Sequence, residues 1–423
     1  MADLIGVLAE PNRRRLLELL SSGEKSVTEL ASRFGVTRSA ISQHLGVLAD
    51  AGLVQVRRDG RFRYYRLDPT GMGALRAALD TFWTHELEQL AAARPLRGSG
   101  GSTVATEKSV LVPLGADETF ALLTEPGRLR RWQTITARID LRAGGEYRWT
   151  IVPGHTAAGT VTEVEPGRRL VFSWGWEDTE DLPPGASTVT ITLEPEEGGT
   201  RVRLVHDGLT PDQAASHAQG WHHYLERLAT AAEKGDAGLD EWGSPPTLDR
   251  LAAAEASLAL CQFVLHNLGP NDADAPTPCS EFTVADLVEH LVVSVTTIGN
   301  AGGASIGALS GDPEERVASG GQQALEAWRR RGLEGTVTLP AGELPGVVAA
   351  DILCLEFLVH AWDFAQASGQ KVAVDDALGA YVLDLAREVI SPALRAGRFA
   401  AELEIGPDAG SFERLLAFTG RAS

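Results

Sequence analysis

The stretch TRSAISQHLGVLADAGLV, residues 37–54, starts with small polar residues and continues with leucines at helical spacing. This spacing predicts an amphipathic helix that begins after Thr37, a favourable N-cap, and turns Leu45, Leu48 and Leu53 toward a core. The opposite side of the helix is then exposed and carries polar side chains: Arg38, Ser39, Ser42, Gln43 and His44. An exposed polar strip of this kind predicts contact with another molecule.

Two shorter helical patterns precede this stretch, PNRRRLLELL at 11–20 and SVTELASRFG at 26–35. Ser26, followed three residues later by Glu29, predicts a capping box at the start of the second pattern. Gly35 suits the left-handed position that ends a helix. The short turn from Gly35 into the next helix is typical of a helix-turn-helix.

The segment VQVRRDGRFRYYRLD, residues 54–68, alternates on both sides of Asp59-Gly60, which predicts a β-hairpin. It carries five arginines: Arg57, Arg58, Arg61, Arg63 and Arg66. Serine and glutamine suit base edges in the major groove, whereas arginine suits phosphates. We therefore expect contacts with DNA through Arg38, Ser39, Ser42, Gln43, His44, Arg57, Arg58, Arg61 and Arg63. A winged helix used for protein contacts is the alternative.

The charge of the chain is distributed unevenly. The formal net charge is −19 over 423 residues, but residues 1–100 hold 14 Lys+Arg against 11 Asp+Glu. A basic end on an acidic body indicates that one part faces a polyanion, and it argues against nucleic-acid binding over the whole surface. The three cysteines lack the spacing of a disulfide framework, and no run of 18 apolar residues occurs. The expected location is cytoplasmic, with no membrane partner.

The length of the chain and two linkers predict three domains. The Gly/Ser-rich LRGSGGST at 96–103 and the Gly/Pro-rich GDAGLDEWGSPPT at 235–247 separate segments of different pattern. A hydrophobic content of 43% allows each segment a core of its own. The expected domains are residues 1–96, 103–235 and 246–423.

The first domain resembles the ArsR family of winged-helix repressors through AEPNRRRLLELL, SVTELA, SAISQHLGVLADAGLV and RRDGRFRYYRL, all in order. The resemblance implies an all-α winged helix-turn-helix and a homodimer, which would bind an inverted-repeat operator of double-stranded DNA. The segment 71–93 fits the dimerising last helix of that family. Metal-sensing relatives carry cysteines in the second helix, where this chain reads SVTEL, so metal sensing is not expected in this domain.

The second domain alternates like strands and closes on an amphipathic helix. Through VLVPLGADETFALLTEPGRLRRWQ, GTVTEVEPGRRLVFSW and GWHHYLERLA it resembles the START-like superfamily, in the branch of the activator of heat-shock ATPase. The resemblance implies an α+β helix-grip fold with a cavity. The large aromatic residues suit a pocket for a small apolar or aromatic ligand, expected at Trp149, Trp174, Trp176, Trp221 and His222. The alternative is that these residues simply fill the core.

The third domain is almost wholly helical in its periodicity. PCSEFTVADLVEHLV places His290 on one helix, and LCLEFLVHAWDFAQASG places Glu356 and His360 four residues apart on another. Two imidazoles and a carboxylate make a three-ligand metal site with one open position. By spacing alone, Glu356 and His360 could equally form an ordinary surface salt bridge. Cys354 lies on the opposite helix face, so we expect it to pack in the core.

The same stretches, with SFERLLAFTGR, resemble the DinB-like, mycothiol-dependent maleylpyruvate isomerase superfamily. The resemblance implies an all-α four-helix bundle in which His290, Glu356 and His360 bind a divalent metal, expected to be zinc, with Asp363 supporting a ligand. Mycothiol is then the implied thiol cofactor, and no catalytic residue is assigned.

Taken together, the multidomain sequence predicts a DNA-binding transcriptional regulator whose DNA affinity responds to a ligand or to the metal site. Two alternatives remain. One is a metal- and mycothiol-dependent transferase or isomerase that carries its own regulatory DNA-binding domain. The other is a carrier that sequesters an apolar metabolite.

Overall fold

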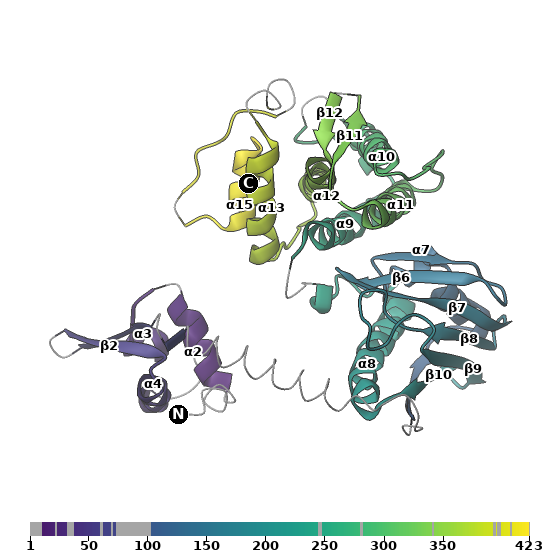
Figure 1. The fold of residues 1–423 in the computed structure, drawn as a ribbon, viewed down its shortest axis with the longest axis horizontal. Helices are drawn as coiled ribbons and strands as arrows, with labels where there is room; N and C mark the ends of the chain where they lie inside the picture. The colour runs from purple at the N-terminus through teal and green to yellow at the C-terminus, as the bar shows by residue number, and fades with distance from the viewer. Residues whose placement is uncertain are drawn as a thin grey trace. The chain divides into compact units, whose positions relative to one another are not determined.

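A computed structural model describes most of the chain (Figure 1). The described residues are 11–21, 23–31, 38–59, 62–68, 71–72, 103–243, 248–279, 282–340, 342–391, 395, 399–406 and 408–422. They belong to two compact units, Met1–Gly100 and Gly101–Ser423, which are treated separately.

The first unit combines three helices with a small antiparallel sheet. The helices are α2 (Pro11–Ser21), α3 (Val27–Ala31) and α4 (Arg38–Asp50). The strands are β1 (Lys25–Ser26), β2 (Val54–Asp59) and β3 (Phe62–Leu67), in the order β1-β3-β2. The predicted hairpin is present, because β2 and β3 pair from Val54↔Leu67 to Asp59↔Phe62. The turn residues Gly60 and Arg61 lie outside the described residues, as does nearly all of the expected dimerising helix 71–93.

The core of the first unit follows the predicted helical spacing. Leu45, Leu48 and Leu53 are fully buried, together with leucines of α2 and α3. The capping box is confirmed, since the Glu29 backbone N–H donates to Ser26 Oγ at 3.2 Å and the Ser26 N–H donates to Glu29 Oε2 at 2.6 Å. The expected caps at Gly35 and Thr37 lie outside the described residues.

The second unit begins with a seven-stranded antiparallel sheet of order β4-β10-β9-β8-β7-β6-β5. Its strands are β4 (Val104–Val112), β5 (Thr136–Ile139), β6 (Glu146–Val152), β7 (His155–Glu165), β8 (Arg169–Trp174), β9 (Ser187–Glu196) and β10 (Gly199–Leu209). The short helices α6 (Ala116–Thr124) and α7 (Pro126–Leu129) follow β4.

The long helix α8 (Pro211–Lys234) closes this sheet, as Figure 1 shows. It starts at a Thr210/Gln213 capping box and ends at Gly235, whose left-handed φ of 88° favours glycine. Its apolar face, with Trp221, Tyr224 and Leu228, packs into the core of the sheet. The predicted strands and closing helix are therefore present.

The remainder of the second unit is mainly helical and has a hydrophobic core of its own. Its helices are α9 (Arg250–His266), α10 (Val284–Ala301), α11 (Pro313–Arg331), α12 (Gly346–Ser368), α13 (Asp376–Val389) and α15 (Ser411–Phe418). Helices α9 to α12 pack on one another, and α13 lies beside α15 (Figure 1). Short 3₁₀ turns occur at η1 (Glu241–Gly243) and η2 (Asp272–Asp274).

Residues 248–422 are mainly helical, as expected, but their described part also contains one short β-hairpin. Strands β11 (Thr336–Leu339) and β12 (Gly342–Pro345) form an antiparallel hairpin between α11 and α12. The segment TVTL alternates β-branched and apolar residues, which suits a strand, and Val337 is the buried member of β11. The segment is too short for its alternation to stand out from the helical pattern around it.

Buried ion pairs join the sheet-rich part to the helical part within the second unit. The Arg130 guanidinium donates to both carboxylate oxygens of Glu314 at 2.7 and 2.9 Å, and Arg131 Nη2 donates to Glu314 Oε1 at 2.8 Å. The three side chains are 8%, 8% and 4% exposed. The linker at 235–247 thus separates two hydrophobic cores that share one compact unit.

Candidate functional site

Helix α4 presents a polar face outward from the first unit. Ile41, Leu45 and Leu48 are fully buried, so the side chains between them turn away from the core. Ser42 and Gln43 are exposed, and His44 is half-buried and takes part in an interaction of its own. The side chains of Arg38 and Ser39 lie outside the described ones. Among the described side chains of α4, Ser42 and Gln43 are therefore exposed and available for base edges.

The arginines of the hairpin are of two kinds. Arg58 and Arg63 stand directly opposite each other across β2 and β3, both exposed, and neither has an ion-pair partner among the described residues. Like charges at directly opposite positions of two strands repel each other. A phosphate bound between the two guanidinium groups would relieve this repulsion. Arg57 instead pairs with Glu24 at 2.8 Å and lies over the Tyr64 ring, and Arg66 donates to Gln55 at 2.7 Å.

The aromatic residues of the sheet-rich part form one cluster. Trp174 lies at its centre, with ring centroids 6.4 Å from Trp149, 5.4 Å from Trp176 and 5.1 Å from Trp221. Trp149, Trp174 and Trp221 are buried, and Trp176 is half-buried. Four of the five expected pocket residues are thus brought together.

His222 does not join this cluster, contrary to expectation. Its side chain is 65% exposed and lies 3.5 Å from Glu226, one turn further along α8. The reason is helical geometry: Trp221 faces the sheet, and its neighbour in sequence is rotated about 100° around the helix axis, toward solvent. The sequence-based prediction placed Trp221 and His222 on the same face of the helix.

Two histidines that sequence reasoning missed belong to the cluster, His206 on β10 and His217 on α8. His206 Nε2 lies 2.8 Å from Ser187 Oγ, which resembles a base beside a nucleophile. However, Trp221 Nε1 donates to His206 Nδ1 at 3.0 Å, so the ring proton sits on Nε2 and points at the serine. Burial lowers the pKa of His206 to about 3. This pair is therefore a structural hydrogen bond and lacks the free lone pair of a base.

The cluster contains polar atoms without partners. Among the described residues, Trp149 Nε1, Trp174 Nε1 and His217 Nε2 are buried and form no hydrogen bond. His217 Nδ1 lies 2.8 Å from the Gln213 carbonyl, so Nδ1 donates and Nε2 is an acceptor. Two donors and one acceptor inside an apolar site suit a ligand with complementary groups, since an unmade buried hydrogen bond costs about 1–3 kcal/mol.

The helical part brings His290, Glu356 and His360 together, from α10 and α12. His290 Nε2 lies 3.3 Å and His360 Nε2 lies 3.4 Å from Glu356 Oε2, and one ligand atom of each residue lies within 4.8 Å of the others. Glu356 Oε2 is buried, and its contacts with the two imidazole nitrogens are long and lack the geometry of a hydrogen bond. An orphaned carboxylate oxygen facing two imidazole nitrogens fits a divalent cation.

Asp363 orients His360 from the other side. Its Oδ2 lies 2.8 Å from His360 Nδ1, which leaves Nε2 directed at Glu356. Arg421 donates to both oxygens of Asp363, at 2.7 and 2.8 Å. A carboxylate that holds the second nitrogen of a histidine is the usual support of a metal ligand.

Charges determine the protonation of this group. Burial opposes ionisation of Glu356, but the two imidazoles lower its pKa below the usual range. Burial also opposes ionisation of Asp363, but Arg421 and His360 lower its pKa to about 2. Although burial favours neutral His360, Asp363 and Glu356 raise its pKa well above the usual value. The two carboxylates thus favour a positive charge at this position, which either a proton on His360 or a bound cation would supply.

Cys279 is a residue that sequence reasoning missed. Its Sγ lies 3.3 Å from Asp363 Oδ2 and 3.3 Å from Arg421 Nη2, so Cys279, His360 and Asp363 form a second group with metal-ligand geometry. Asp363 already receives two donors there, which favours the first group as the cation site. Cys354 is buried next to Ser257 and, as expected, packs in the core.

A helix-turn-helix with an exposed polar helix and a basic hairpin, joined to a helix-closed sheet, defines a DNA-binding transcriptional regulator with an accessory domain. Comparison with known proteins gives the families. Residues 10–56 match "Bacterial regulatory protein, arsR family". Residues 114–233 match "Activator of Hsp90 ATPase homolog 1-like protein".

Three similar proteins extend this result. The chain is 51% identical over 80 residues to an HTH-type transcriptional regulator of Mycobacterium tuberculosis, covering 19% of this chain and 75% of that protein. It is 33% identical over 70 residues to a transcriptional repressor of Bacillus subtilis, covering 16% and 78%. It is 32% identical over 182 residues to an uncharacterised protein of M. tuberculosis, covering 41% and 98%.

The chain therefore belongs to the arsR family of bacterial regulatory proteins, and it carries an activator-of-Hsp90-ATPase-like domain followed by a helical region. The expected resemblances of the first two domains are confirmed. Among the described residues, no helix is both long and apolar enough to cross a membrane.

Proposed function

We propose that the protein is a ligand-responsive transcriptional repressor that binds an inverted-repeat operator as a homodimer. The observation that carries the proposal is the exposed Ser42-Gln43 face of α4 in the same unit as the opposed Arg58–Arg63 pair. The first can read base edges and the second can bind phosphate. The similarity to a transcriptional repressor of B. subtilis supports repression, as opposed to activation, of transcription.

The homodimer is proposed together with the inverted-repeat operator. One copy of a short recognition helix reads a single half-site, and two copies read half-sites about one helical turn, roughly 34 Å, apart. Sedimentation of the full chain tests this: the expected mass is twice the 45.0 kDa of one chain. A monomer at all concentrations, with no preference for its own promoter over random duplex, would refute the proposal.

The ligand site that we propose is the aromatic cluster around Trp174. Three buried polar atoms support this site, because none of them forms a hydrogen bond with the described residues: Trp149 Nε1, Trp174 Nε1 and His217 Nε2. A small aromatic or apolar molecule with one polar edge would pair with them while its body contacts the rings. Regulation requires that this ligand favour one DNA-binding state over the other.

The ligand is testable through Trp174→Phe, which removes the indole N–H and keeps an aromatic ring. We expect native mass spectrometry of the full chain to detect a co-purified small molecule, and Trp174→Phe to weaken its binding about tenfold, the equivalent of one hydrogen bond. Adding the identified compound should change operator affinity. His222→Ala, on the exposed side of α8, is the control and should behave as wild type. Unchanged operator affinity over the full titration would exclude a regulatory ligand.

We also propose that His290, Glu356 and His360 hold a divalent cation, with Asp363 orienting His360. The buried Glu356 Oε2 without a hydrogen bond supports this placement. Nitrogen and carboxylate ligands together suit zinc. Bound there, the metal would supply Lewis acidity and an open coordination position.

Metal content should therefore fall when the imidazoles are removed. We expect elemental analysis to give about one equivalent in the wild-type chain, and little in His290→Ala or His360→Ala, because two remaining protein ligands hold zinc weakly. The control is again His222→Ala, since His222 and Glu226 repeat the imidazole–carboxylate spacing of one helical turn without a second imidazole. Wild-type metal content in both test variants would remove the site.

A second candidate function is a metal- and thiol-dependent transferase or isomerase. The observation that favours it is the three-residue ligand set, which leaves room for a thiol as a fourth ligand. A metal lowers the pKa of a bound thiol and so produces the attacking thiolate. Consumption of mycothiol by the metal-loaded full chain with a panel of electrophiles tests it, and no consumption with any electrophile would exclude it.

A further inference from the structure

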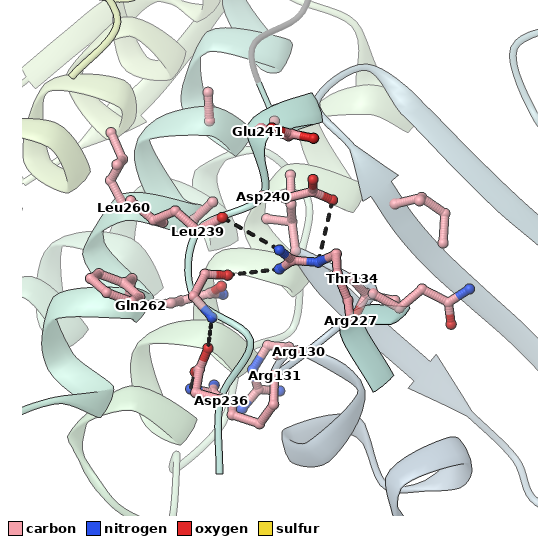
Figure 2. A pocket seen from close by; sticks show the side chains of 18 of the residues that line it. Arg130, Arg131, Thr134, Arg227, Asp236, Leu239, Asp240, Glu241, Leu260 and Gln262 are labelled. Carbon is pink, nitrogen blue, oxygen red and sulfur yellow. Dashed lines mark hydrogen bonds and ion pairs between the residues drawn. The ribbon is translucent and has the colours of Figure 1, made fainter. Parts of the chain in front are cut away.

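A cavity of 340 Å³ lies where the sheet-rich part, the linker and the helical part of the second unit meet (Figure 2). Its walls come from residues 130–135, from β6 and α8, from linker residues 236–243, from α9, and from the segment 373–378. This volume falls in the range of small-molecule sites, which form preferentially between domains. The cavity is separate from the aromatic cluster around Trp174 and contains none of its residues.

One part of the wall is apolar. It is formed by side chains of α9 and of both neighbouring parts: Ile135, Ile151, Ala259, Leu260, Phe263 and Leu378. Such a lining suits the hydrocarbon body of a ligand, because burying apolar surface contributes about 25 cal/mol per Å².

Two polar residues in the wall have unmet hydrogen bonds. Thr134 and Gln262 both line the cavity and are only 7% and 4% exposed. Among the described residues, Thr134 Oγ1 and Gln262 Nε2 have no hydrogen-bond partner. Native proteins rarely leave such groups unpaired, because each costs about 1–3 kcal/mol. A ligand group that pairs with either atom would recover this free energy.

The charges of the wall indicate that the ligand is uncharged. The three arginines all have acceptors. Arg130 and Arg131 pair with Glu314. Arg227, which Figure 2 shows beside Leu239 and Asp240, donates to the carbonyls of Trp132 and Gly238 at 2.9 and 2.7 Å. The wall also contains four carboxylates: Asp236, Asp240, Glu241 and Asp375. Two of them are paired, because Asp236 lies 3.1 Å from Arg131 Nη1 and Asp240 lies 2.8 Å from His223 Nε2. A ligand carboxylate would find no spare cation and would meet an acidic wall.

We infer that this cavity binds a small, uncharged amphipathic molecule, with an amide-like polar head at Thr134 and Gln262 and an apolar body against α9. Because the wall belongs to three segments of the second unit, the bound molecule stabilises their arrangement. The inference does not depend on DNA binding, and its test measures binding directly.

The test uses three probes with the same body: 4-butylbenzamide, 4-butylbenzoate and butylbenzene. Calorimetric titration of the full chain is expected to show binding of the amide at least about tenfold tighter than binding of the other two. The amide should also raise the thermal midpoint in a concentration-dependent way. Equal affinity for the amide and the hydrocarbon, or no binding of the amide, would overturn the inference.

Two variants locate the binding. Ala259→Phe fills the cavity and should abolish amide binding, whereas Ala215→Phe, at an exposed position of α8, should leave it unchanged. Gln262→Leu keeps the shape of the wall and should reduce amide affinity to that of butylbenzene, without loss of stability in the absence of ligand. Wild-type amide affinity in Ala259→Phe, or in Gln262→Leu, would show that the amide binds elsewhere.

Discussion

Replacing Glu314 by glutamine is expected to lower the free energy of unfolding of the second unit by about 3–5 kcal/mol. Glu314 receives hydrogen bonds from Arg130 and Arg131, and all three side chains are at most 8% exposed. Removing one partner of a buried ion pair leaves uncompensated charge away from water. Arg131 keeps Asp236 at 3.1 Å, so most of the cost arises at Arg130.

Chemical denaturation followed by tryptophan fluorescence measures this change. The matched control is Glu107→Gln, which removes the same charge from a two-point pair with Arg203 at a site where both side chains are about half exposed. Water and salt screen that pair, so hardly any change is expected there. Equal, small effects of the two substitutions would mean that Glu314 does not hold the two parts together.

The effect of Glu314 should depend on pH. Burial opposes ionisation of Glu314, but Arg130 and Arg131 lower its pKa below the ordinary value of 4.5. A carboxyl group whose pKa is lowered by folding stabilises the protein above that ordinary value, and the stabilisation is lost as the pH falls through the lowered pKa. The stability difference between wild type and Glu314→Gln should therefore be full at pH 7 and shrink below about pH 4.5. A difference that grows toward acid pH would contradict this assignment.

Loss of operator preference is the second large effect that we expect. The double variant Ser42→Ala, Gln43→Ala removes two exposed polar side chains of α4 and keeps its buried leucines. Each good side chain–base contact contributes about 1–3 kcal/mol of discrimination, so preference for the operator should fall by about tenfold to a hundredfold or more. Binding to random duplex should change little, because phosphate contacts supply it.

Substitutions in the hairpin should lower affinity for every duplex and leave the preference for the operator largely unchanged. Arg58→Ala and Arg63→Ala are each expected to weaken binding to every duplex and to reduce the salt slope by about 0.9, the value for one phosphate contact. Arg142→Ala, an exposed arginine of the second unit, is the control. Gel-shift titrations at several salt concentrations distinguish the two groups. If the α4 variant kept full operator preference, α4 would not be the reading helix.

The candidate sites differ in how far the sequence predicted them. The carboxylate–imidazole set was anticipated because Glu356 and His360 are one helical turn apart and therefore share a helix face. Cys279 was missed, because its contact with Asp363 joins residues 84 positions apart in a fold that the local pattern does not encode. His222 was misplaced because neighbours in a helical sequence point in different directions.

The sequence by itself determined the helix-turn-helix, the capping box, the arginine-rich hairpin and the order of strands and closing helix, because caps, turns and periodicity act over a few residues. Only the tertiary structure decided which polar groups stay unpaired, which arginines are already neutralised, and where a cavity opens. Arg130 meets Glu314 across 184 residues, and Thr134 and Gln262 share a wall although they lie in different parts of the unit. Such pairings depend on how the two hydrophobic cores pack against each other. Caps, turns and periodicity describe only neighbouring residues, so they do not specify that packing.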